Sequence, residues 1–216
     1  MNIELRSDFR DYYDHWFSAS FQTPELVFMR NSFWGMSRSE MFYFFQKYGF
    51  ATPTNGVVNQ LVGRIEHKEK VVVYIDPYAH RSAGKILCSL QEALSVYSNF
   101  YASKFIAKCA GQSFRLLRIG SHYFWLSYKS DTWQSNNGNV EIKILDHQVD
   151  QSARPKFFPE NPLLAIDYLL SDNVLLAIDL NISPGIKGTG IEKVFSSKKV
   201  FSEIEKFFTK GTHYGL

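Results

Sequence analysis

The amino-acid sequence predicts an α+β fold, in which helices come early in the chain and an antiparallel sheet comes late. Two observations support this prediction. Ser37 and Ser89 each precede a glutamate by three positions, the capping-box spacing that begins a helix. From residue 114 onward, apolar runs rich in β-branched and aromatic residues alternate with turn residues, as in a sheet of short strands. A chain of 216 residues can bury a substantial core, as one domain or as two small lobes.

The first half of the chain contains three predicted helices and one predicted strand. Aromatic residues at helical spacing predict a short helix at residues 7–16. A second helix is predicted at residues 37–48, because apolar residues follow the capping box at core spacing and Gly49 ends the pattern. Residues 70–76 are rich in valine and predict a strand, and residues 89–97 predict another short helix.

The second half of the chain is predicted to form an antiparallel meander followed by a hairpin. Its strands are separated by glycine, asparagine and proline, which favour turns. The predicted strands are residues 114–119, 122–129, 140–145, 163–170 and 174–181. A helix at residues 199–208 is predicted to close the fold.

The composition is that of a folded protein, with 45% hydrophobic, 21% charged and 16% aromatic residues. The net charge of +3 is too small to indicate nucleic-acid binding unless basic residues cluster. The aromatic segment 123–133 leaves stacking on single-stranded nucleic acid open, although core packing explains these rings more simply. Cys88 and Cys109 lack the spacing of a zinc site or a disulfide framework. No segment resembles a signal sequence or a membrane span, so we expect a cytoplasmic protein with no membrane association.

Two acids stand where buried strands usually carry leucine, Asp167 in the first arm of the predicted hairpin and Asp179 in the second. If a three-residue loop centred on Asn173 joins the arms, the two aspartates face each other and Asn181 projects from the same face. Two carboxylates and an amide oxygen suit a hard divalent ion such as Mg²⁺ that also binds substrate phosphates. A two-residue turn would instead place Asp179 on the opposite face and leave two edge-exposed acids.

A loop of small and basic residues, 77–85, follows the valine-rich strand. Such loops bind anions through backbone N–H groups and a lysine, here Lys85. With a single glycine the loop matches neither the Walker pattern nor GxGxxG, so a plain surface turn is the preferred interpretation and an anion-binding loop is the alternative.

Four stretches of the second half resemble a known family. Residues 114–120 are similar to a strand with an arginine and a glycine ending, and residues 131–136 to the loop that follows. Residues 165–170 and 177–185 are similar to two metal-binding strands, the second ending in proline and glycine. Together these stretches resemble the C-terminal part of ATP-grasp ligases, in particular the ribosomal-protein glutamate ligase group.

The resemblance implies a two-lobed ATP-grasp-like fold with antiparallel sheets, flanking helices and ATP between the lobes. We expect the lobes at residues 1–106 and 107–216, without the N-terminal substrate domain usual in the family. The cofactors would be ATP and Mg²⁺. The activity would be a ligase that activates a small-molecule or peptide carboxylate as an acyl phosphate for attack by an amine. A partner chain could supply the missing substrate domain.

The resemblance also assigns roles to individual residues. Asp167, Asp179 and Asn181 would hold the metal, and Arg115 would be catalytic by stabilising the transferring group. The expected ligands of the nucleotide are Lys85, Asn136 and Lys104. Lys187 would bind an anionic substrate, with a solvated lysine as the alternative.

Three departures from the family pattern leave a second function open, and the first is the expected lack of the N-terminal substrate domain. Tyr74 replaces the lysine expected at the end of the valine-rich strand, with Lys85 or Lys70 as a possible substitute, and residues 101–106 lack the hinge acid that faces adenine. The alternative is therefore a degenerate ATP-grasp module that binds nucleotide or protein without ligase activity.

Overall fold

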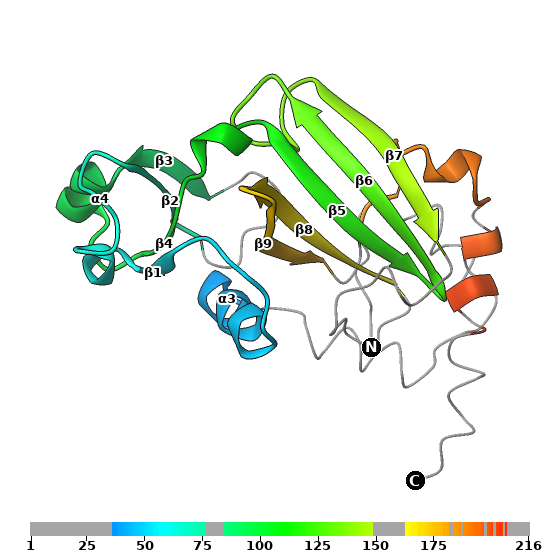
Figure 1. Ribbon diagram of the computed structural model, residues 1–216, viewed down its shortest axis with the longest axis horizontal. Coiled ribbons are helices and arrows are strands. Elements are labelled where there is room, and N and C mark those ends of the chain that lie inside the picture. The colour runs from blue at the N-terminus through cyan, green and yellow to red at the C-terminus, as the bar shows by residue number, and fades with distance from the viewer. Residues whose placement is uncertain are drawn as a thin grey trace, which may run out of the picture.

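The computed structural model describes residues 36–76, 84–148, 163–181, 184–186, 188–196, 198–200, 202–204 and 206. The helix predicted at residues 7–16 lies outside these ranges, as does Lys187. Within them the chain forms two antiparallel sheets with few helices, which confirms the predicted α+β class. In Figure 1 the smaller sheet lies at the left and the larger at the right.

The smaller sheet has four strands in the order β1-β4-β2-β3, and every pair is antiparallel. Its strands are β1 (Asn55–Val57), β2 (Lys70–Tyr74), β3 (Lys85–Ser89) and β4 (Tyr101–Lys104). The short 3-10 helix η2 (Val58–Leu61) and helix α4 (Leu90–Val96) pack on this sheet around Val71 and Val73. The predicted capping box of α4 is confirmed, since Ser89 and Glu92 bond reciprocally.

The larger sheet has five strands in the order β7-β6-β5-β8-β9. They are β5 (Gln112–Ile119), β6 (His122–Ser130), β7 (Val140–Gln148), β8 (Leu163–Ser171) and β9 (Val174–Asn181). The meander of β5, β6 and β7 and the hairpin of β8 and β9 are as predicted. The short 3-10 helix η3 (Ala107–Cys109) connects the two sheets, and η5 (Ile191–Lys193) follows the hairpin.

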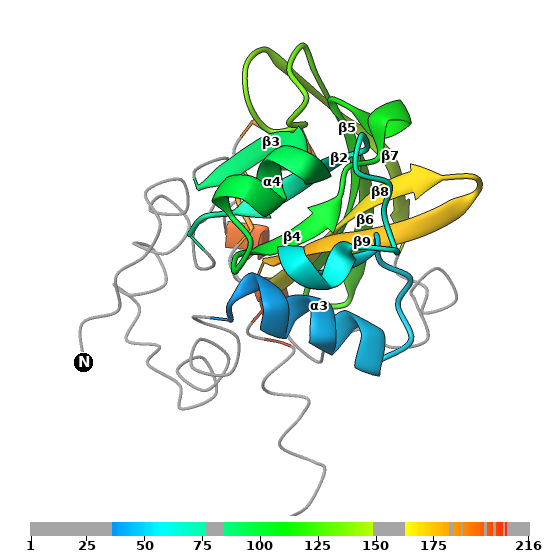
Figure 2. The ribbon, with the colours of Figure 1, turned by 90° about the vertical axis from the view of Figure 1, so that its left-hand side faces the viewer.

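Helix α3 (Arg38–Lys47) joins the two sheets through one core. Its Phe42 and Phe45 are fully buried and pack with Tyr74 of β2 and with Leu116 and Ile166 of the larger sheet. Burying each phenylalanine contributes about 1.5–3 kcal/mol. Figures 1 and 2 both show α3 beside β9, below the place where the two sheets meet. The opposite face of the larger sheet packs on the C-terminal segment, including Ile186, Ile191 and Val200.

The hairpin pairs Asp167 with Asp179 as predicted, but its turn differs from the predicted one. Its turn has two residues, Asp172 and Asn173, both with positive φ (52° and 63°), which is the geometry of a type I′ turn. This turn alone would put Asp179 on the wrong face. However, Ile178 forms a β-bulge, so that Tyr168 pairs with Ala177 and Asp167 pairs with Asp179. The three-residue loop was therefore wrong, and the facing pair of aspartates was right.

No helix in the described part of the chain has the length and apolar character needed to cross a bilayer.

Candidate functional site

A cleft that is partly open to solvent lies between the two sheets. Side chains from both sheets line it, together with the connection between them. The lining residues used below are Tyr74, Lys85, Ser103, Lys104, Phe105, Ile106, Trp133, Asn136, Asp167 and Asp179.

Asp167 of β8 sits on the larger-sheet side of this cleft, directly opposite Arg115 of β5. The two oxygens of its carboxylate accept bonds of 2.6 and 2.8 Å from Arg115 Nε and Nη2. Only 12% of the Asp167 side chain and 13% of the Arg115 side chain are exposed. Burial lowers the pKa of Arg115, but Asp167, Tyr128 and Asp179 together raise it by more, so the guanidinium stays charged. Arg115 is therefore a permanent counterion of Asp167.

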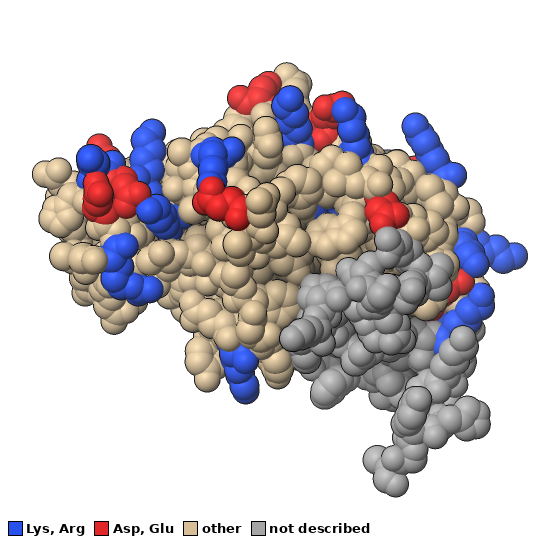
Figure 3. Space-filling view, in the orientation of Figure 1, with Lys and Arg blue, Asp and Glu red and all other residues tan. Residues whose placement is uncertain are grey.

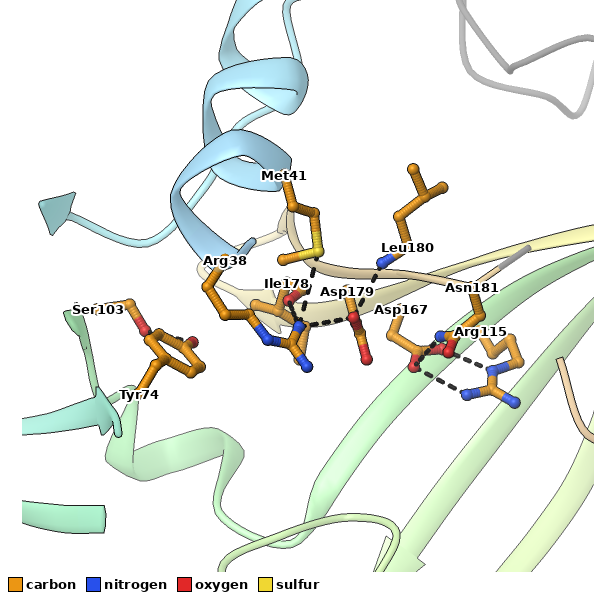
Figure 4. Close-up of polar contacts among 10 residues, drawn as sticks. All are labelled: Arg38, Met41, Tyr74, Ser103, Arg115, Asp167, Ile178, Asp179, Leu180 and Asn181. Carbon is orange, nitrogen blue, oxygen red and sulfur yellow. Dashed lines mark hydrogen bonds and ion pairs between the residues drawn. The ribbon is translucent and has the colours of Figure 1, made fainter. Parts of the chain in front are cut away.

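Asp179 of β9 faces Asp167 and is also paired with an arginine. Arg38, the first residue of α3, donates from Nη1 to Asp179 Oδ1 at 2.6 Å, as Figure 4 shows. Burial raises the pKa of Asp179, but Arg38, Lys85 and Arg115 together hold it below its usual value. Asp179 is thus an ionised carboxylate in a cationic surrounding.

Asn181 completes the set that the sequence predicted to hold a metal. It lies opposite Ala165, two residues beyond Asp179, and its Nδ2 lies 3.4 Å from Asp167 Oδ2. The structure therefore brings Asp167, Asp179 and Asn181 together at one place (Figure 4).

The chemistry of these donors fits Mg²⁺, which takes one or two protein carboxylates and completes its shell with water and phosphate oxygens. Among the described residues, Arg38 and Leu180 donate hydrogen bonds to the Asp179 carboxylate, and both bonds are accepted by Oδ1. These two bonds leave the lone pairs of Oδ2 available for a metal. Among the described residues, no group of three or more histidine, cysteine or acidic side chains could hold a metal ion.

Lys85 lines the cleft from the smaller sheet. It is the first residue of β3 and pairs across the sheet with Tyr74, the residue that stands in the lysine's place. Burial, and after it Arg38, lower the pKa of Lys85 to about 8, against the raising effects of Asp179 and Asp167. Tyr74 is held by a 3.0 Å hydrogen bond between its hydroxyl and that of Ser103.

Lys104 lies at the end of β4, where the chain leaves the smaller sheet. Its Nζ forms a 2.6 Å ion pair with Glu69, which immediately precedes β2. The hinge stretch lacks an acid of its own, but the fold brings this glutamate to it from another segment. Next to Lys104, Phe105 and Ile106 line the cleft, and the Phe105 ring meets Trp133 edge to face at 6.0 Å. These side chains make an apolar wall of the kind that a flat base can contact.

Asn136 lines the same cleft from the turn between β6 and β7. Five of the residues singled out from the sequence thus share the cleft: Lys85, Lys104, Asn136, Asp167 and Asp179. Arg115 lies behind Asp167 instead of lining the cleft, and Lys187 is outside the described residues.

Sequence reasoning missed Arg38 and the apolar wall formed by Phe105, Ile106 and Trp133. Arg38 follows the N-cap of a helix and has no sequence signal, because its partner lies 141 residues away. Trp133 had been considered as a core or stacking residue, and its place beside Phe105 comes only from the fold.

The face shown in Figure 3 carries lysine and arginine interspersed with aspartate and glutamate. It shows no broad basic patch of the kind that binds nucleic acid.

No protein-family model and no curated protein matches the sequence. Comparison of structures, in contrast, finds ATP-grasp ligases. D-alanine–D-alanine ligase from Bacillus anthracis, complexed with ATP, matches with a TM-score of 0.53 and 11% identity, over 83% of this chain and 68% of that one. A RiPP-associated ATP-grasp ligase of Chryseobacterium gregarium, in complex with ADP and a leader and core peptide, matches with a TM-score of 0.51 and 13% identity, over 96% of this chain and 71% of that one.

A third similar structure is the ATP-grasp ligase PsnB with a minimal precursor, with a TM-score of 0.52 and 13% identity over 80% of this chain and 60% of that one. Identities this low carry information about the fold alone. The two-sheet fold is that of ATP-grasp ligases, as the resemblance in the sequence implied.

Proposed function

Starting from the ATP-grasp fold, we propose that the chain binds ATP in the cleft between its two sheets and activates a carboxylate as an acyl phosphate for attack by an amine. The observation that carries this proposal is the composition of the cleft. Lys85 and Lys104 reach it from the smaller sheet, and Asp167 and Asp179 from the larger one. Cations for phosphates and oxygen ligands for a metal therefore face one another across the cleft.

Each wall of the cleft has its own task in this proposal. The wall of Phe105, Ile106 and Trp133 holds the base, with Lys104 beside it. Lys85 binds the β-phosphate, and Asn136 contacts the γ-phosphate. Fixed donors of this kind position the phosphates, and phosphoryl transfer depends on positioning and charge neutralisation more than on covalent help.

Asp167, Asp179 and Asn181 are the proposed ligands of Mg²⁺. When bound, the ion would neutralise charge on the phosphates that bridge to it. Because both Asp167 oxygens accept from Arg115, we assign Arg115 a positioning role, in which it holds the Asp167 carboxylate toward the cleft. This role replaces the direct contact with the transferring group that the sequence suggested.

The substrate class that we propose is a peptide carboxylate, with a small-molecule carboxylate as the alternative. One of the similar structures is a ligase in complex with a leader and core peptide, and another is a ligase complexed with a minimal precursor, which supports the first choice. The proposal includes a cytoplasmic location, two lobes divided near residue 106, and a partner chain that completes the substrate surface.

Isothermal titration with ATP and Mg²⁺ tests nucleotide binding. We expect heat of binding in the wild type and little in Asp179→Asn, because that variant removes a carboxylate from the cleft. Asp172→Asn is the matched control, since it removes an exposed acid from the turn of the same hairpin and should bind normally. Thermal melting of each variant verifies folding. Absence of heat in the wild type, or equal heat in Asp179→Asn, would contradict the proposal.

A second function is favoured by one specific observation. Each of the two carboxylates already has an arginine partner, Arg38 or Arg115, and Tyr74 stands in the lysine position. A nucleotide-binding or protein-interaction module without ligase chemistry would tolerate this arrangement. Release of ADP that depends on an added amine distinguishes the ligase from the module. The ligase would show this release, whereas the module would bind ATP and show only background turnover.

A further inference from the structure

The charges around the candidate metal ligands do not favour a bare metal ion. Two carboxylates, Asp167 and Asp179, lie beside Arg115 and Arg38 at 2.6 Å each, and Lys85 lines the same cleft. With Lys85 protonated, these five side chains have one positive charge in excess. A divalent cation alone would increase that excess, whereas a polyphosphate would offset it.

Arg38 is the cation in direct contact with Asp179 Oδ1, the carboxylate whose Oδ2 is suited to the metal. It comes from α3, and its helix start is fixed by the Ser37 capping box. Only 5% of Arg38 is exposed. Its guanidinium also lies 3.5 Å from the carbonyl of the bulged Ile178 and 5.4 Å from the centre of the Tyr74 ring.

These contacts hold Arg38 in place (Figure 4). A buried guanidinium cannot lose its proton to relieve a neighbouring cation. Arg38 therefore repels any metal ion that approaches Asp179 without phosphates or other anions bound to the metal.

We propose that Arg38 prevents a bare divalent cation from binding at Asp179, so that the metal enters the cleft only with the phosphates of a nucleotide. Arg38 is a positioning residue in this scheme: it fixes the Asp179 carboxylate and sets the order in which ligands bind. The inference rests on the proposed function for the identity of the nucleotide site. Its core, the competition between Arg38 and a metal for Asp179, can be measured without nucleotide.

Binding of Mn²⁺, a paramagnetic substitute for Mg²⁺, is followed by the loss of the free-ion signal in electron paramagnetic resonance. Without nucleotide, we expect Arg38→Gln to bind Mn²⁺ at least about tenfold more tightly than the wild type, which corresponds to about 1.4 kcal/mol. Lys47→Gln is the matched control, because Lys47 is an exposed cation in the last turn of the same helix. It should behave as the wild type does.

Two further variants separate the proposed effect from damage to the fold. Arg38→Lys keeps the charge and should still exclude Mn²⁺. In the double variant Arg38→Gln with Asp179→Asn, the gained affinity should disappear, which places the ion at Asp179. Melting curves establish that each variant is folded. If Arg38→Gln does not fold, the test uses the wild type and Arg38→Lys. Neither should bind Mn²⁺ in the absence of ADP, and both should bind it in the presence of ADP.

Three outcomes would overturn the inference: tight binding of bare Mn²⁺ by the wild type, no gain in folded Arg38→Gln, or an equal gain in Lys47→Gln. Titration with ATP in the presence of a chelator distinguishes this failure from failure of the proposed function. If ATP never binds but Arg38→Gln gains Mn²⁺, the competition stands and the ligase proposal falls.

Discussion

At the scale of single residues, Lys85 gives the cleft a derivable pH dependence. Its lowered pKa of about 8 means that the ammonium form, which attracts phosphates, is present below that pH and is lost as the pH rises through it. We expect the affinity for ATP to fall by about tenfold as the pH rises through this pKa, because the neutral amine can no longer make a hydrogen bond from a charged group. Such a bond contributes about 1.5–3 kcal/mol. Calorimetric titrations with ATP at pH values below and above this pKa, at constant ionic strength, measure the fall in affinity.

Two variants of Lys85 serve as controls for the pH series. Lys85→Arg stays charged at every pH used, so its affinity should be flat. Lys85→Met should bind weakly and also without pH dependence. A wild-type affinity that does not change with pH would remove Lys85 from the nucleotide site.

The Arg115 and Asp167 pair makes a prediction about stability. Arg115→Ala leaves an aspartate whose side chain is 12% exposed without its bidentate partner. We expect a loss of about 3–5 kcal/mol in the free energy of unfolding, measured with urea. Replacing both residues, with Arg115→Met and Asp167→Leu, should recover much of the loss, because no buried charge is then left alone.

A control for this prediction is Lys68→Ala, which removes an ion pair whose two side chains are 85% and 68% exposed. Its effect should stay within about 0.5 kcal/mol. If Arg115→Ala is equally mild, Asp167 does not depend on its arginine.

How much of the site could be predicted differs from residue to residue. Asp167 and Asp179 were found because a charge inside an apolar strand requires a partner. Lys85 came from the loop of small and basic residues and from the family resemblance, and Lys104 from the resemblance alone; both line the cleft. Arg38 could not be found, because its contact with Asp179 joins distant parts of the chain and capping explains its position equally well.

At the scale of elements, the hairpin of β8 and β9 shows what an alternation pattern cannot reveal. The pattern identifies both arms and the residues of each face, but it does not specify the loop. The structure uses a two-residue turn and restores the face of Asp179 with the bulge at Ile178. A bulge has no reliable signal in one sequence, since any residue near the αR region can form it.

The turn itself can be tested by substitution. Asn173 has a φ of 63°, a region that asparagine tolerates and glycine prefers. We expect Asn173→Gly to leave the stability unchanged or to raise it slightly, and Asn173→Val to lower it by about 1–2 kcal/mol. Urea unfolding measures both. Equal stabilities for glycine and valine at this position would contradict the type I′ turn.

The strands of the smaller sheet show a second limit. The valine-rich β2 was predicted, whereas β1, β3 and β4 were not. β1 has only three residues, and β3 has a lysine, a cysteine and a serine among its five, so neither shows the alternation of a strand. Pairing with β2 and β4 defines them, and that is a tertiary effect.

At the scale of the whole molecule, the cleft joins two sheets that otherwise meet mainly through α3 and the connection around η3. A ligand bound there should stabilise both. At a nucleotide concentration of 100 times Kd, the free energy of unfolding should rise by about 2.7 kcal/mol. Hydrogen exchange should slow in β2 and β4 as well as in β8 and β9, in the presence of ATP and Mg²⁺.

Sodium sulfate at equal ionic strength serves as the control, because it supplies an anion without a base. Protection that is confined to one sheet would mean that the nucleotide does not bridge the cleft.

The bulge at Ile178 has a consequence for how such chains can diverge. If one residue were inserted or deleted between the two aspartates, they would no longer share a face of the sheet, unless a second insertion or deletion restored the register. A turn longer by one residue makes the extra residue in β9 unnecessary. Homologues that keep both acids should therefore come in two kinds, with a short turn and a bulge or with a longer turn and an uninterrupted strand, and intermediates should be rare.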